Sequence, residues 1–72
     1  MPSKIPILRP AQVIRALEKA GFRFVSQIGS HRKYSDGKHT VIIPMHRELA
    51  GGTLRSVLLQ ADMTIEELSL YL

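Results

Sequence analysis

The stretch HRKYSDGKHTVII, residues 31–43, decides the fold. Asp36-Gly37 stands between two alternating runs, and Asp-Gly is a strong hairpin signal because a type I′ turn needs positive φ at both central positions. A two-residue loop would place Tyr34 opposite His39. The sequence therefore predicts an antiparallel hairpin whose register is set by this turn.

Side chains alternate across a strand, so this register divides the hairpin into two faces. The face richer in bulky apolar residues is expected to meet the helices, and it comprises Arg32, Tyr34, His39, Val41 and Ile43. The other face is expected to be open, and it comprises His31, Lys33, Ser35, Lys38, Thr40 and Ile42. A preceding strand over 22–28 should add Phe22 and Phe24 to the core face and send Arg23, Val25 and Gln27 to the open face.

Outside this three-strand meander the apolar spacing becomes helical. A helix is predicted over 10–20, with Pro10 in its first turn and Gly21 as its stop. After a loop at 45–52, Thr53 is the expected N-cap of a helix whose apolar stripe is Leu54, Val57, Leu58 and Ala61. Thr64 and Glu67 form a capping box for a short last helix. The predicted order is α-β-β-β-α-α in one domain, residues 1–72, with an extended arm at 1–9.

The charge of the chain is concentrated in one region. The formal net charge is +4 in 72 residues. Residues 23–47 hold five Lys and Arg and one acid, whereas the remaining residues hold five basic and five acidic side chains. A basic patch on an open sheet face favours nucleic acid as a partner. The alternative is a solvated sheet face without a partner, which is common in antiparallel sheets.

Several classes of protein are excluded or disfavoured. The absence of cysteine excludes disulfide scaffolds, cysteine-ligated metal sites and a cysteine nucleophile. His31 and His39 fall on opposite predicted faces and the acids are scattered, so we expect no metal and no cofactor. Residues 1–10 contain no apolar signal region, and no apolar run is long enough to span a bilayer. A cytoplasmic protein is the expectation.

His31 is the candidate for chemistry. It opens the second predicted strand on the basic face, and imidazole exchanges protons near neutral pH. It could act in the attack of an RNA 2′-hydroxyl on the neighbouring phosphate, with Lys33 stabilising the charged phosphorane. The alternative is a surface histidine that only donates a hydrogen bond to phosphate. The helix start at Gly51-Gly52-Thr53, with Arg55, could hold one further backbone phosphate.

The order of short motifs in the chain is similar to that of the HicA (YcfA-like) toxin family over residues 10–70. The motifs are Leu17–Phe22, Gly29-Ser30-His31 with Tyr34, Val41–Pro44 with His46, Gly52–Arg55 and Thr64–Leu68. The resemblance implies an α+β, double-stranded-RNA-binding-domain-like fold with helices on one face of a three-stranded antiparallel sheet. It also implies a bacterial toxin that cleaves mRNA without a metal and blocks translation, and a HicB-type antitoxin that covers the active site.

The family's Gly-Ser-His motif assigns the catalytic role to His31. The residues expected to contact RNA are Arg23, Gly29, Ser30, Lys33, Lys38, His46 and Arg55, and His46 is interpreted as a loop contact, not a second catalyst. The acidic end, with Asp62, Glu66 and Glu67, should not meet RNA. The free toxin is expected to be a monomer that forms a hetero-oligomer with the antitoxin, whose acids would pair with the basic open face.

Two other functions remain open at this stage. A non-catalytic double-stranded-RNA-binding module would use the same basic face to read shape and phosphates. A pure protein-interaction subunit would be signalled by a broad exposed apolar patch, and the predicted faces leave none.

Overall fold

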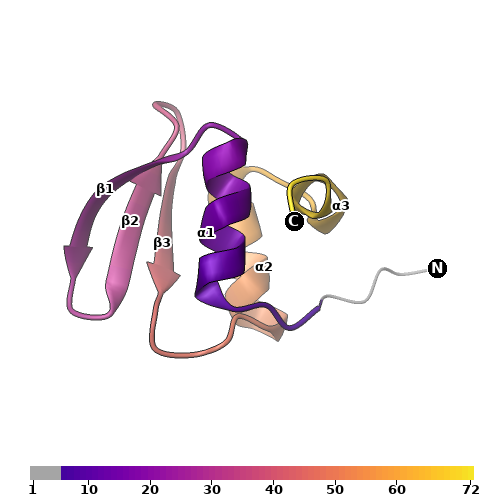
Figure 1. Cartoon of the computed structure of the whole chain (residues 1–72), viewed down its shortest axis with the longest axis horizontal. Coiled ribbons are helices and arrows are strands. Elements are labelled where there is room, and N and C mark those ends of the chain that lie inside the picture. Colours follow the sequence, from indigo (N-terminus) through magenta and orange to yellow (C-terminus); the bar gives the residue numbers. More distant parts are fainter. Residues whose placement is uncertain (1–5) are drawn as a thin grey trace.

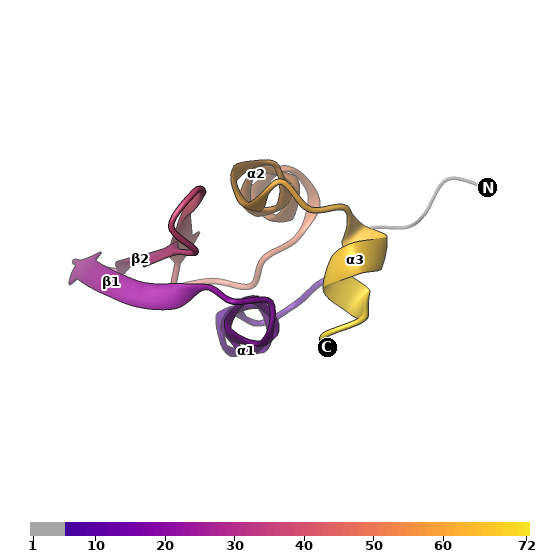
Figure 2. The ribbon, with the colours of Figure 1, turned by 90° about the horizontal axis from the view of Figure 1, so that it is seen from above.

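A computed structural model describes residues 6–72 and contains three helices and three strands in these residues. They are α1 (Pro10–Lys19), β1 (Arg23–Ile28), β2 (His31–Ser35), β3 (Thr40–Pro44), α2 (Gly51–Ala61) and α3 (Ile65–Ser69). The strands form an antiparallel sheet in the order β1-β2-β3. Helices α1 and α2 lie beside the sheet, and α3 lies on their far side from it (Figures 1 and 2). The predicted α+β class and element order are confirmed, and the topology is consistent with a double-stranded-RNA-binding-domain-like fold.

The core lies between the helices and one face of the sheet. The sheet contributes Tyr34, Val41 and Ile43, the three apolar residues that alternation placed on the core face. The two polar residues expected on that face, Arg32 and His39, are only partly buried. The helices contribute the buried apolar side chains Val13, Ile14, Ala16, Leu17, Leu54, Val57, Leu58, Ala61 and Leu68. The opposite face of β2 and β3 is called the open face below, and Arg23 of β1 belongs to it because Arg23 pairs with Ser35. The open face comprises Arg23, His31, Lys33, Ser35, Thr40 and Ile42.

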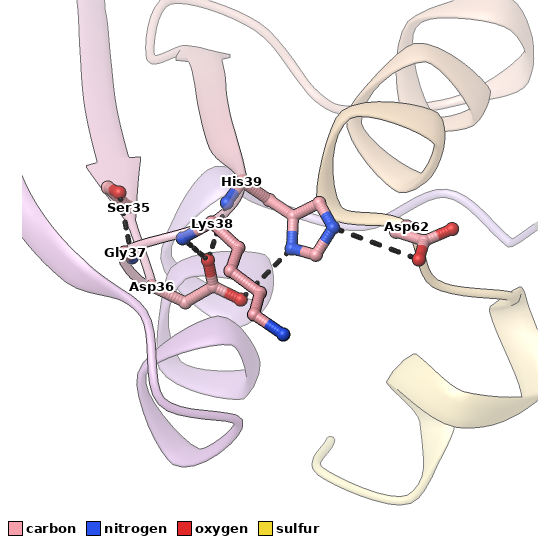
Figure 3. Close-up of polar contacts among 6 residues, drawn as sticks. All are labelled: Ser35, Asp36, Gly37, Lys38, His39 and Asp62. Carbon is pink, nitrogen blue, oxygen red and sulfur yellow. Dashed lines mark hydrogen bonds and ion pairs between the residues drawn. The ribbon is translucent and has the colours of Figure 1, made fainter.

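The predicted register of the β2–β3 hairpin is wrong by two residues. Tyr34 pairs with Val41, not with His39, because residues 36–39 form a longer turn. The Asp36 side chain explains this turn: its Oδ1 accepts hydrogen bonds from the backbone N–H groups of Lys38 (2.9 Å) and His39 (2.6 Å) (Figure 3). A shift of two residues preserves the alternation, so the residues of β3 stay on the faces predicted for them. Lys38 and His39, which were predicted to be in the strand, lie in the turn instead.

The turn also lowers the pKa of one acidic side chain, that of Asp36. Hydrogen bonds to the backbone N–H of His39 and then of Lys38, together with the contact to the His39 ring, lower the pKa of Asp36 from 3.8 to about 2. His39 Nδ1 lies 3.2 Å from Asp36 Oδ2, and its Nε2 lies 3.8 Å from Asp62 Oδ2 (Figure 3). His39 therefore links the turn to the end of α2, and it does not sit opposite Tyr34 as expected.

Strand β1 departs from the prediction because of an irregularity between Phe24 and Ser26. Before it, Phe24 pairs with Tyr34 and their rings meet edge to face at 5.8 Å, but Phe24 is 53% exposed at the margin of the sheet. After it, Gln27 pairs with Arg32 and accepts a hydrogen bond from Arg32 Nε at 2.9 Å, so Gln27 is not on the open face. Strand β1 thus exposes two apolar side chains that the predicted faces did not foresee, Phe24 and Ile28, together with Val25, which was expected to be exposed.

Of the two predicted helix N-caps, Thr53 and Thr64, only Thr64 caps its helix. Helix α2 begins at Gly51 with Ala50 as its N-cap, and Thr53 N already donates to Ala50 O, so Thr53 is not the N-cap. The Thr64 capping box is confirmed by reciprocal hydrogen bonds with Glu67 of 2.9 and 3.1 Å.

The predicted arm at 1–9 falls partly outside the described residues, which begin at residue 6. Within the described part, Leu8 is buried and exchanges two backbone hydrogen bonds with Leu49, of 2.9 and 2.7 Å. The chain just before α1 is therefore held against the loop that precedes α2.

Candidate active site

His31 occupies the first position of β2, immediately after a tight turn. Ile28 pairs with His31, so Gly29-Ser30 is a two-residue hairpin loop. Gly29 has φ 58°, in the left-handed region that such a turn requires at its first central position. The turn leaves the imidazole of His31 exposed at one end of the open face.

The loop after β3 folds back onto this turn. The backbone N of Met45 donates to Ser30 O at 2.6 Å, and His46 Nδ1 lies 3.0 Å from Ser30 Oγ. The rings of His31 and His46 meet edge to face, with centroids 6.1 Å apart and planes at 67°. Arg47 Nε donates to His46 Nε2 at 3.1 Å. Two imidazoles, one hydroxyl and one guanidinium are therefore gathered at the start of β2.

A shallow pocket of about 400 Å³ opens beside His31. Ile42 and Pro44 line its sheet side, and Thr53, Ser56 and Gln60 line its α2 side. Gln60 also closes the free edge of β3, because its Oε1 accepts from Ile42 N (2.9 Å). The pocket thus combines an apolar wall with hydroxyl and amide groups, the mixture that orients a small organic group.

A comparison with protein-family models decides the class of the protein. The model for the HicA toxin of bacterial toxin-antitoxin matches residues 10–63. The chain belongs to the HicA toxin family. No curated protein sequence matches the chain. Membership makes this HicA protein the toxin of a toxin–antitoxin system, with an antitoxin as its partner.

The structure divides the predicted RNA contacts of this HicA protein among three places. Gly29, Ser30 and His46 lie with His31 at the start of β2, and Lys33 follows two residues later on the same face. Arg23 pairs with Ser35 and Lys38 lies in the turn, so both are at the other end of the sheet. At ~3.3 Å per residue, the four steps from His31 to Ser35 cover about 13 Å. Arg55 is exposed on α2.

Sequence reasoning missed Arg47 and two residues on the α2 wall of the pocket, Ser56 and Gln60, although it had singled out Thr53 at the start of that helix. Arg47 counted only toward the regional charge, although its position directly after His46 was a usable signal. Ser56 and Gln60 gave no signal, because polar residues on an exposed helix side are expected in any amphipathic helix.

Residues 6–72 show neither a group of side chains suited to a metal nor a helix suited to a membrane. No three His, Cys, Asp or Glu side chains in this range lie close enough together to hold a metal ion. None of its helices has the length and apolar character needed to cross a membrane.

Proposed function

We propose that this HicA protein is an endoribonuclease that cleaves mRNA in the cytoplasm without a metal and so blocks translation, with His31 as a proton-transfer residue. The observation that supports this best is the exposed imidazole of His31 on the open face, at the rim of a pocket. Imidazole is the side chain best suited to exchange protons at neutral pH.

The proposed reaction is a transesterification within the RNA. The 2′-oxygen attacks the adjacent phosphorus, and the bond from phosphorus to the 5′-oxygen of the next nucleotide breaks. The 2′-hydroxyl loses its proton and the departing 5′-oxygen gains one, so the products carry a 2′,3′-cyclic phosphate and a 5′-hydroxyl. Lys33, on the same face as His31, would stabilise the negative charge that develops on the phosphorane.

The basic residues farther away would hold the RNA chain. Arg23 and Lys38, at the other end of the sheet, would contact backbone phosphates beyond the scissile one, and Arg55 would contact one beside α2. The Gly29-Ser30 turn would approach the scissile phosphate. The pocket beside His31 would hold part of one nucleotide that is unpaired, as nucleotides in single-stranded RNA are.

The antitoxin would inhibit by covering the open face. We infer a HicB-type protein that presents acidic groups to Lys33, Arg23 and Lys38, because complementary charge directs such docking. The free toxin would be a monomer and the inhibited form a hetero-oligomer. The acidic side chains Asp62 and Glu67 lie on the α2–α3 side and would stay clear of the RNA.

The test compares the wild-type protein with His31→Ala and with His39→Gln, a control at the other end of the hairpin. Growth arrest after induction and cleavage of RNA in EDTA are measured, and the product ends are analysed. We expect cyclic phosphate ends and growth arrest from the wild type and from His39→Gln, and neither from His31→Ala. If His31→Ala cleaves like the wild type, the proposal is wrong. If the wild type shifts RNA but leaves it intact, the protein is a non-catalytic RNA-binding module instead.

A further inference from the structure

The proposed cleavage needs two proton transfers, and His31 can supply only one of them in a single step. A base must remove the proton of the 2′-hydroxyl while an acid protonates the 5′-oxygen on the other side of the phosphorus. On the α2 wall of the pocket beside His31, Thr53, Ser56 and Gln60 offer only hydroxyl and amide groups, which are too weak as bases. The turn, the strand and the exit loop place four other polar side chains around His31: Ser30, Lys33, His46 and Arg47.

The chemistry of these four groups selects one of them. The ammonium of Lys33 and the guanidinium of Arg47 have no lone pair to accept a proton, and the hydroxyl of Ser30 is too weak a base near neutral pH. His46 carries an imidazole, the side chain type that can both accept and donate a proton in general acid–base catalysis. Its ring centroid lies 6.1 Å from that of His31, so a phosphate group can contact both rings from the solvent side.

The hydrogen bonds of His46 define which role it has. Arg47 Nε donates to His46 Nε2, so Nε2 presents a lone pair. The proton of the neutral ring is then on Nδ1, which donates to Ser30 Oγ. A base that is oriented through its other nitrogen by a third group is the usual arrangement of an activated pair. Guanidinium groups bind phosphate strongly, so binding of the RNA phosphate by Arg47 would release Nε2.

We propose that His46 is the general base of this HicA protein and that His31 is the general acid. His46 Nε2 takes the proton of the 2′-hydroxyl as the oxygen–phosphorus bond forms, and His31 gives a proton to the 5′-oxygen as its bond to phosphorus breaks. The protonated His46 and the neutral His31 then exchange protons with water. This inference rests on the proposed ribonuclease function, and it replaces the interpretation of His46 from the sequence, which was a loop contact and not a second catalyst.

The test uses His46→Asn, whose amide can keep the hydrogen bond to Ser30 but cannot accept the proton. We expect cleavage of RNA, measured as kcat/KM, to fall by about 10²- to 10⁴-fold. The rise of kcat/KM with pH on the acid side should also disappear, because that limb reports the base. Ser30→Ala is the matched control for a positioning effect: it should lose less activity and keep both limbs of the pH profile.

A substrate with sulfur in place of the 5′-oxygen separates acid from base, because a thiolate leaves without a proton. We expect this substrate to restore cleavage by His31→Ala and not by His46→Asn. Restored cleavage by His46→Asn, or activity of this variant within about threefold of the wild type on normal RNA, would overturn the assignment. In either case a loss of cleavage in His31→Ala would leave the proposed function intact, whereas wild-type activity in His31→Ala would end both.

Discussion

The two ends of the β2–β3 hairpin each hold an exposed or half-exposed histidine in contrasting surroundings. At the turn, His39 lies 3.2 Å from one carboxylate, of Asp36, and 3.8 Å from another, of Asp62. At the opposite end, His31 faces a second imidazole, and the guanidinium of Arg47 is bound to that imidazole. Two carboxylates thus lie against the His39 ring, whereas the His31 ring meets another imidazole. The same residue type lies among acidic side chains in one place and beside a second imidazole in the other.

The largest effect is expected when a carboxylate, like those beside His39, is introduced at the His31 end of the hairpin. Arg47→Asp places a carboxylate beside His46, where it would face an RNA phosphate. Two negative charges brought together at an interface cost several kcal/mol. We expect RNA cleavage, measured as kcat/KM at low salt, to fall by about 100-fold or more. Arg15→Asp on α1 changes the net charge equally and should reduce kcat/KM far less. Equal losses in both variants would mean that total charge, and not the local contrast, governs activity.

The two turns of the sheet offer a second way to separate the ends. Gly29 (φ 58°) and Gly37 (φ 96°) have positive φ and open space around the missing side chain. Gly29→Ala and Gly37→Ala should each lower the free energy of unfolding by about 1–2 kcal/mol, because L-residues are strained there. Urea denaturation measures this loss.

Only Gly29→Ala should also reduce cleavage, since its turn positions Ser30 and through it the exit loop. The assay is run at a temperature where both variants are fully folded. A greater loss of cleavage in Gly37→Ala would mean that the active site is at the 36–39 turn and not at the His31 end.

The smallest effect concerns acid stability. Because folding lowers the pKa of Asp36 from 3.8 to about 2, the ionised form stabilises the native state above about pH 4. This contribution is lost as the pH falls from about 4 to 2. The free energy of unfolding should therefore decline less steeply over this interval in Asp36→Asn than in the wild type, as measured by urea denaturation at successive pH values. A parallel decline in both proteins would show that the turn does not hold Asp36 ionised.

The alternation of residues in the hairpin was sufficient to predict which of its faces is buried. The exact register was not predictable from Asp36-Gly37 alone, because the Asp36 side chain caps two backbone N–H groups and lengthens the turn. The even shift spared the face assignment. On β1 an irregularity after Phe24 changed the alternation by one residue, and no periodic pattern in the sequence marks that position.

The candidate site was predictable at His31 and not in its surroundings. The Gly29-Ser30-His31 motif placed His31 at the start of the second strand, which is local information. The approach of His46 depends on the hydrogen bond from Met45 N to Ser30 O, between residues far apart in the chain. Such a contact forms only after the sheet is assembled, so the second imidazole and its bond to Arg47 became visible only in the folded chain.

The most direct test of the contrast between the two ends is the single-turnover rate of cleavage of one defined RNA, in EDTA, by His31→Ala and by His39→Ala. Both variants lose one imidazole from the same hairpin. The account predicts that His39→Ala cleaves within a few-fold of the wild type and that His31→Ala is slower by about 10²-fold or more. Equal rates in the two variants, or a slower His39→Ala, would contradict it.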